Sequence, residues 1–227
     1  MDRVSIDIET IPLAAALLPA ELVPAAEAEG MSRFLVNGEA ATEEEIKKLS
    51  LDSITSRIVA IALAKFDQNS NPKESTVLYG EDEAKILDAF WKFLEKPAPV
   101  QLVAHNGLTF DLPFIWRRSI IQNVRPSKQF NLARYRTDTI YDTMQLWANW
   151  NNRDYVGLDR LSAALGLGAK TGSGSQVLGL WLEGKHEEVA KYCYQDALLT
   201  YGCFCRMNFL PIPDLRSLEE SCALQFF

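Results

Sequence analysis

The strongest constraint on the fold is the alternation of short apolar strands with amphipathic helices. Apolar runs at Val4–Ile8, Arg57–Lys65 and Val100–Ala104 have the length and composition of strands. Between the second and third runs, Glu83–Glu95 repeats apolar side chains at helical spacing. Such alternation favours an α/β fold, with a sheet covered by helices on both faces. The other predicted elements are a strand at Ser75–Tyr79 and helices at Asp111–Ile121, Leu158–Leu165 and Glu187–Met207.

Length and composition are those of one globular domain. The chain has 227 residues, and single domains of roughly 200–250 residues are ordinary. We therefore predict a single domain over residues 1–227, with an Ala- and Glu-rich insertion at about 12–56. The formal net charge of −7 provides no overall positive field for a polyanion. A nucleic acid would have to be held by a local basic path and by metal.

All four cysteines lie in the last part of the chain and form no CxxC unit or spaced pairs. This pattern is typical of reduced thiols, three of which we expect to pack as small apolar side chains on or beside the last helix. We therefore expect a cytoplasmic setting. The two histidines are not spaced for a zinc site.

The first motif is the acidic pair in SIDIET. On a strand, Asp7 and Glu9 project to the same face, while Ile6 and Ile8 point to the core. Two neighbouring carboxylates repel each other unless a cation lies between them. An exposed strand end with two solvated acids would show the same spacing.

The second motif is HNGLTFDLPF. Asp111 begins a predicted helix after a strand, a position that the helix dipole alone would favour for an acid. It follows Asn106 and Gly107, which suit a tight turn and a polar contact to a sugar or phosphate. Phe110 has an aromatic face on which a base can stack, although an aromatic residue here also suits the core.

The third motif is KYCYQDALLTY. Tyr192 and Asp196 are four residues apart and share one face of a helix, so the phenol can reach a metal bound by the aspartate. Alone, the pair also fits an ordinary amphipathic helix. The three motifs in this order favour a metal-dependent phosphodiesterase. Carboxylates suit Mg²⁺ or Mn²⁺, and two such ions about 4 Å apart can clamp a phosphodiester during in-line attack.

The chain resembles the DEDD superfamily of 3′-5′ exonucleases, in the subgroup with tyrosine in the last motif (DEDDy, DnaQ-like). It is most similar to free-standing proteins related to the proofreading exonuclease domain of family B DNA polymerases. Lys191, at the position of the histidine variant's base, and Tyr192 fit the tyrosine subgroup. The matching segments are Asp7–Pro12, His105–Phe114, Asp142–Leu146, Gly157–Leu167 and Tyr192–Tyr201.

The resemblance implies a ribonuclease H-like three-layer fold with a central mixed five-stranded sheet of order 3-2-1-4-5. It also implies two Mg²⁺ or Mn²⁺ ions, with Asp7, Glu9, Asp111 and Asp196 as ligands. On this view Tyr192 orients or deprotonates the attacking water, and the products are nucleoside 5′-monophosphates. The loop at Lys170 departs from the pattern, because similar proteins often carry an acid beside the glycine.

Substrate contacts are predicted at Thr10, Asn106, Phe110 and Lys170. The segment from Leu112 to Thr137 contains no acid and suggests a path for the phosphates of a single strand, although it also fits a solvated helix face and loop. Its basic residues are Arg117, Arg118, Arg125, Lys128, Arg134 and Arg136.

The expected partner is the 3′ end of a single-stranded nucleic acid, DNA or RNA, with no membrane and no protein partner deducible. Two alternatives stay open on the same fold. One is a catalytically silent nucleic-acid-binding module, and the other is a structure-specific endonuclease.

Overall fold

The computed structural model describes residues 1–13, 48–95, 99–168 and 176–227. The insertion predicted at about 12–56 falls mostly outside these residues and stays a prediction. Among the described residues, no helix is long and apolar enough to cross a membrane. The strands are β1 (Asp2–Pro12), β2 (Ser56–Phe66), β3 (Pro72–Tyr79), β4 (Val100–Ala104), β5 (Ile140–Asp142) and β6 (Ala223–Phe226). The helices are α4 (Glu83–Leu94), α5 (Asp111–Ile121), α6 (Thr143–Trp147), η2 (Asn152–Asp154), α7 (Leu158–Ala164), α8 (Val177–Leu182), α9 (His186–Met207) and α10 (Leu215–Glu219).

The six strands form one sheet in the order β5-β4-β1-β2-β3-β6. β1 pairs antiparallel with β2 and parallel with β4, so the sheet is mixed. The predicted order 3-2-1-4-5 is confirmed. The predicted count of five strands is too low, because β6 adds to the outer edge of β3 in parallel register. β6 was not predicted because it has only four residues, three of which are exposed.

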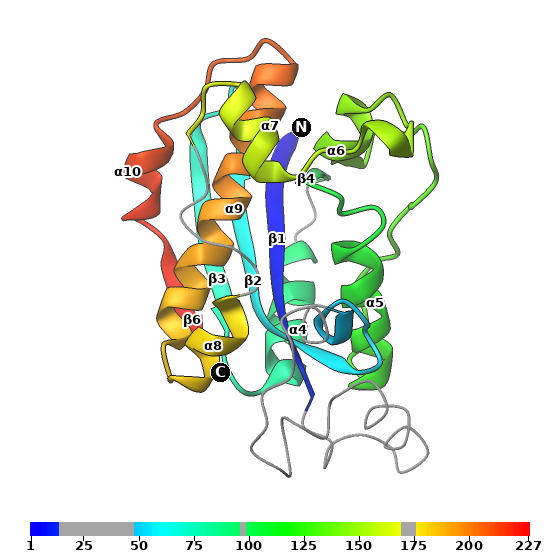
Figure 1. The fold of residues 1–227 in the computed structure, drawn as a ribbon, viewed down its shortest axis with the longest axis vertical. Coiled ribbons are helices and arrows are strands. Elements are labelled where there is room, and N and C mark those ends of the chain that lie inside the picture. Colours follow the sequence, from blue (N-terminus) through cyan, green and yellow to red (C-terminus); the bar gives the residue numbers. More distant parts are fainter. Residues whose placement is uncertain (14–47, 96–98, 169–175) are drawn as a thin grey trace.

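Helices cover both faces of the sheet, which gives the predicted three layers (Figure 1). α9 crosses one face and contacts β1, β2, β3 and β4, with α7, α8 and α10 beside it. α4 and α5 pack together on the other face. β2 lies between the two layers, so its residues from Ile58 to Ala64 are completely buried. The family resemblance correctly predicts this ribonuclease H-like architecture.

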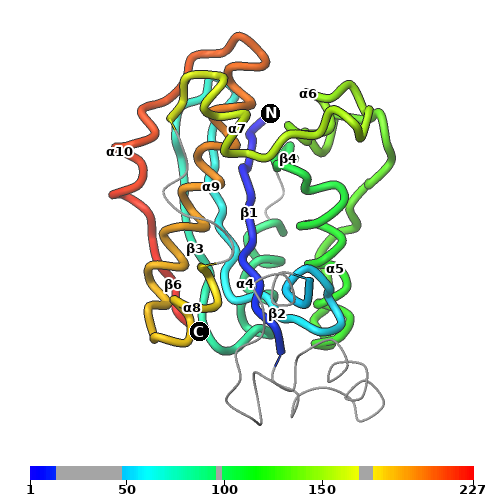
Figure 2. The backbone as a smooth tube through the Cα atoms, in the orientation of Figure 1, coloured from blue at the N-terminus to red at the C-terminus, as the bar shows by residue number. Residues whose placement is uncertain are grey.

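β1 runs through the middle of the molecule, and the tube in Figure 2 shows α9 running alongside it. Val4, Ile6 and Ile8 belong to the core on the α4 and α5 side. Ser5 faces the opposite side, where its hydroxyl donates a 2.6 Å hydrogen bond to the carbonyl of Ala197 on α9. Alternate residues of β1 therefore face α9, which places Asp7 and Glu9 on the α9 side.

Candidate active site

The two acids of β1 lie beside the completely buried part of β2. Asp7 pairs with Ala62 and Glu9 with Ala60 of β2, and the register shifts between Glu9 and Thr10. Irregular strand pairing of this kind often occurs beside functional sites, because it changes the direction of a side chain. Asp7 is partly exposed, whereas Glu9 is only 9% exposed. The predicted common face of the two acids and the buried position of Ile6 and Ile8 are confirmed.

α9 brings the third motif against this face of β1. Asp196 is 3% exposed, and Tyr192 lies one turn earlier and is partly buried. Between them, the thiol of Cys193 donates a 3.4 Å hydrogen bond to the backbone carbonyl of Asp7. This bond and the Ser5–Ala197 bond fix the helix to the strand at two points one turn apart.

Asp111 reaches β1 from the opposite layer. The pairing of β4 with β1 ends at Val103 and Ser5, so the residues of β1 after Ser5 are not paired with β4. There the carboxylate of Asp111, the first residue of α5, accepts a hydrogen bond from the backbone of Ile8. Asp111 therefore lies beside the strand that carries Asp7 and Glu9, beyond the carboxyl end of β4, where α/β proteins commonly bind ligands.

The electrostatics of the site indicate a concentration of negative charge. The pKa of Asp111 is raised from 3.8 to about 7, first by burial and also by the charges of Asp142 and Asp196, against the hydrogen bonds that its carboxylate accepts. Burial also raises the pKa of the Cys193 thiol well above its usual value, helped by the charges of Asp7 and Glu9. A divalent cation would remove this mutual repulsion.

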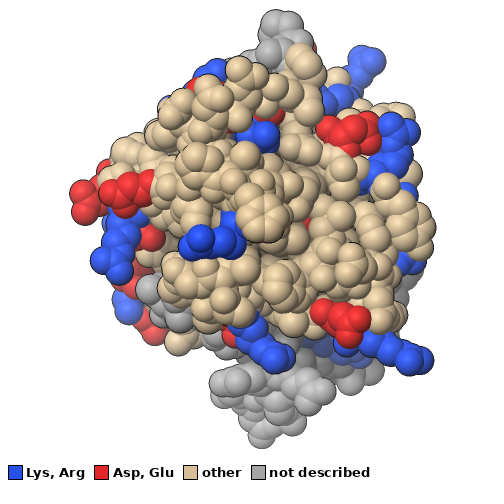
Figure 3. Space-filling view, turned by 90° about the horizontal axis from the view of Figure 1, so that it is seen from above, with Lys and Arg blue, Asp and Glu red and all other residues tan. Residues whose placement is uncertain are grey.

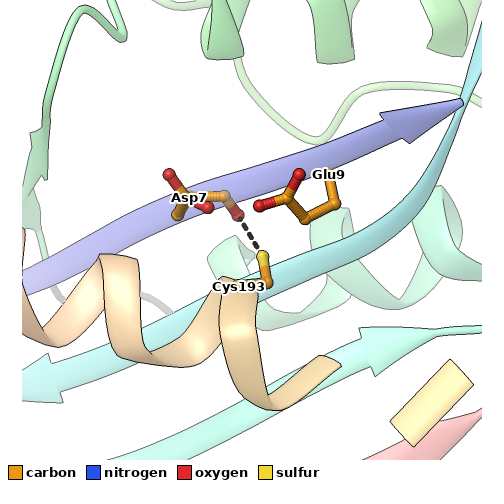
Figure 4. Close-up of side chains that lie close together, drawn as sticks. All are labelled: Asp7, Glu9 and Cys193. Carbon is orange, nitrogen blue, oxygen red and sulfur yellow. Dashed lines mark hydrogen bonds between the residues drawn. The ribbon is translucent and has the colours of Figure 1, made fainter. Parts of the chain in front are cut away.

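The three donor atoms that lie closest together come from Asp7, Glu9 and Cys193. Within the described part of the chain, one oxygen of each carboxylate and the cysteine sulfur all lie within 4.8 Å of one another. Figure 4 shows both carboxylates on the same side of β1, with Cys193 pointing at the strand from α9. Asp111 and Asp196 are outside this tight group, although their charges interact. Sequence reasoning placed Cys193 in the core and missed its position at the acids.

Asp142 is a second residue that the prediction of site residues missed. It is 1% exposed and lies where β5 ends and α6 begins. Its carboxylate accepts four backbone N–H bonds of 3.0–3.1 Å: those of Asn106 and Leu108 from the second motif, and those of Met144 and Gln145 from α6. Asp142 thus fixes the turn that leads into Asp111. The sequence signal was an acid directly before a short helix, as at an N-cap.

Three of the four residues predicted to touch substrate have protein partners. The hydroxyl of Thr10 donates a 2.6 Å bond to the carbonyl of Ser50. Asn106 has a left-handed φ of 67°, and its side chain accepts a hydrogen bond from Thr109. The ring of Phe110 packs against Phe114, with 5.3 Å between the ring centroids. Lys170 lies outside the described residues. These substrate contacts stay predictions.

The basic stretch is not continuous in space. Arg118 is 1% exposed and binds Glu83 through two hydrogen bonds of 2.6 and 2.9 Å, so its predicted role in a phosphate path is wrong. Arg136 is exposed but pairs with Asp138. Figure 3 shows lysine and arginine side chains separated from one another on the face seen from above.

A cavity of about 580 Å³ opens beside Tyr192, between α8 and α9. Gln176, Leu180, Lys191 and Gln195 are among the residues that line it. Its volume lies in the range of small-molecule sites.

Two comparisons with known proteins agree with the fold. A family described as "Predicted 3'-5' exonuclease related to the exonuclease domain of PolB" matches residues 50–212. The matched range includes Asp111, Tyr192 and Asp196, and it begins after β1. Among solved structures, the chain is similar to the family B DNA polymerase from the hyperthermophilic archaeon Pyrobaculum calidifontis, with a TM-score of 0.57 and 14% identity. That match covers 92% of this chain and 24% of the polymerase, so the chain spans about a quarter of its length. No curated protein matches the chain.

Proposed function

Because the chain belongs to the family of predicted 3′-5′ exonucleases related to the exonuclease domain of PolB, we propose that it is a metal-dependent 3′-5′ exonuclease. It removes nucleoside 5′-monophosphates from single-stranded DNA or RNA ends. The observation that carries the proposal is the approach of Asp111 and α9 to β1. Asp111 accepts the backbone N–H of Ile8, and Cys193, between Tyr192 and Asp196, donates to the carbonyl of Asp7.

The residues fit a pair of Mg²⁺ or Mn²⁺ ions. Hard divalent cations prefer carboxylate oxygens, and the proposed ligands Asp7, Glu9, Asp111 and Asp196 are all carboxylates. Burial and the charges of Asp142 and Asp196 raise the pKa of Asp111, and a bound cation would favour the charged form of this carboxylate. When bound, the two ions would activate a water molecule and stabilise the charge on the leaving 3′ oxygen.

Each proposed residue has a separate task at the phosphodiester. Tyr192 lies one helical turn before Asp196, so its hydroxyl holds the attacking water beside the ligands. The backbone of Ile8 holds the carboxylate of Asp111 at the edge of β1, where this carboxylate would serve as a ligand of the second ion. Phe110 precedes Asp111 and supports the terminal base by stacking.

The test uses 5′-labelled single strands with Mn²⁺ present. With a free 3′ end, we expect a ladder that shortens one nucleotide at a time, and with a blocked 3′ end we expect no cleavage. Cleavage of the blocked strand would identify an endonuclease, and a mobility shift without cleavage would identify a binding module. Parallel DNA and RNA strands of the same sequence determine which nucleic acid is preferred.

The matched variants separate chemistry from folding. Asp7→Ala and Asp196→Ala remove one proposed ligand each, so turnover should fall by several orders of magnitude while the circular dichroism spectrum is retained. Asp138→Ala, which removes only an exposed partner of Arg136, should keep full activity. Wild-type activity in either ligand variant would refute the proposed site.

A further inference from the structure

Cys193 adds a sulfur atom to a site that hard cations would bind through oxygen alone. Its side chain is completely buried and points from α9 at β1, beside Asp7 and Glu9 (Figure 4). The thiol donates to the carbonyl of Asp7 at 3.4 Å, so its position relative to the strand is fixed. The proposed chemistry, as described above, makes no use of this group.

The three donor atoms are close enough to share one ion. They all lie within 4.8 Å of one another. In a tetrahedral zinc site, metal–sulfur and metal–oxygen distances of about 2.3 and 2.1 Å place the two ligand atoms roughly 3.6 Å apart. Side-chain rotation of the two acids can supply the remaining movement of about 1 Å. The buried thiol can then stay where α9 holds it.

Sulfur changes which ions the site prefers. Mg²⁺ and Mn²⁺ bind oxygen ligands, whereas Zn²⁺ and Cd²⁺ gain strongly from a thiolate. We propose that Asp7, Glu9 and Cys193 form a mixed oxygen and sulfur site that captures thiophilic divalent ions, and that this capture inhibits the enzyme. On binding, the thiol proton leaves to solvent, a sulfur–metal bond forms, and the hydrogen bond to the Asp7 carbonyl is lost.

Inhibition follows from competition for the same carboxylates. An ion bound to the sulfur uses Asp7 and Glu9, which the proposed reaction needs for its own cations. This second part rests on the proposed function, whereas the binding of a thiophilic ion does not. The two parts are therefore measured separately.

The binding experiment uses Co²⁺ alone as the probe, without nucleic acid. Cobalt bound to a thiolate gives an intense charge-transfer band in the near ultraviolet, which an oxygen-only site lacks. We expect this band in the wild type and in the control Cys222→Ser, which removes the most accessible thiol. In Cys193→Ser the band should disappear. A band that survives in Cys193→Ser, or that is absent from the wild type, overturns the proposal.

The inhibition experiment titrates Zn²⁺ into a cleavage assay at fixed Mn²⁺. The zinc concentration for half inhibition should rise at least tenfold in Cys193→Ser and stay unchanged in Cys222→Ser. An equal response of all three proteins overturns the inhibitory role. Should Cys193→Ser fail to fold, cadmium-113 NMR of the wild type reports the same sulfur ligand directly, and a resonance in the oxygen-only range refutes it. If no nucleic acid is cleaved at all, the proposed function fails while the cobalt result stands.

Discussion

Replacing Arg118 by alanine should destabilise the protein far more than replacing its neighbour Arg117. Arg118 is 1% exposed and donates to both carboxylate oxygens of Glu83 and to the carbonyl of Ser53. Arg117, one residue earlier on the same helix, is exposed. The two substitutions remove the same side chain from opposite environments.

The magnitude follows from the charge that is left behind. Without Arg118, the carboxylate of Glu83 stays buried, and within the described ranges its remaining hydrogen bonds come only from the N–H of Ile58 at 2.8 Å and the side-chain amide of Gln122 at 2.7 Å. Removing one partner of a buried ion pair typically costs about 3–5 kcal/mol. An exposed arginine away from such contacts changes stability by about 0.5 kcal/mol or less.

Urea unfolding measures the difference. We expect Arg118→Ala to lower the midpoint strongly with little change in slope, and Arg117→Ala to leave it almost unchanged. In a double-mutant cycle, the variant with both Glu83→Ala and Arg118→Ala should lose less stability than the sum of the two single variants. Each single variant leaves one buried charge without its partner, whereas the double variant removes both charges. A loss below about 1 kcal/mol for Arg118→Ala would refute the reasoning.

Three further predictions concern the turn and the helix around Asp111. Asp142→Asn keeps one side-chain oxygen, which can still accept three of the four N–H bonds, but it turns an amide group toward the N–H of Leu108. Urea unfolding should therefore show that the unfolding free energy falls by about 1–3 kcal/mol. A gain in stability would contradict the assigned contacts. Gly107→Ala would place a methyl group 2.3 Å from the side chain of Ala104. Both the stability of the protein and its Mn²⁺ affinity, measured by calorimetry, should therefore fall. Unchanged values would show that the turn tolerates a side chain. Because burial raises the pKa of Asp111 from 3.8 to about 7, the folded protein in EDTA binds more protons than the unfolded chain between these pH values. Its unfolding free energy should therefore fall by on the order of 3 kcal/mol from about pH 5 to pH 8, and urea titrations of Asp111→Asn should lack this loss.

Much of the fold could be predicted because its central elements have long, regular patterns. Val100–Ala104 and Asp111–Ile121 were predicted with the boundaries that the structure shows, and α9 was predicted to within one residue. The short β6 could not be predicted, because it joins the sheet through backbone pairing with β3 rather than through an apolar pattern.

The basic stretch shows the limit of composition as a guide. A count of charges treats Arg117 and Arg118 alike, although only one of them is exposed. A usable signal was present, since Phe114 and Ile115 precede Arg118 by four and three residues and mark the buried face of the helix. The charge partner Glu83, on another helix, could not be identified from local sequence.

The candidate site shows a similar division. Spacing alone predicted that Asp7 and Glu9 share one face of β1, opposite Ile6 and Ile8. It could not predict that Cys193 contacts the Asp7 carbonyl, because the two residues are 186 positions apart and meet only through the packing of α9 on β1.

The same separation has a consequence during protein synthesis. Translation produces Tyr192 and Asp196 about 180 residues after β1. Pairing segments that are distant in the chain is entropically expensive and therefore slow. The α9 side of β1, which carries Asp7 and Glu9, therefore stays uncovered until α9 has been made, and the candidate site is complete only once this helix packs on the strand.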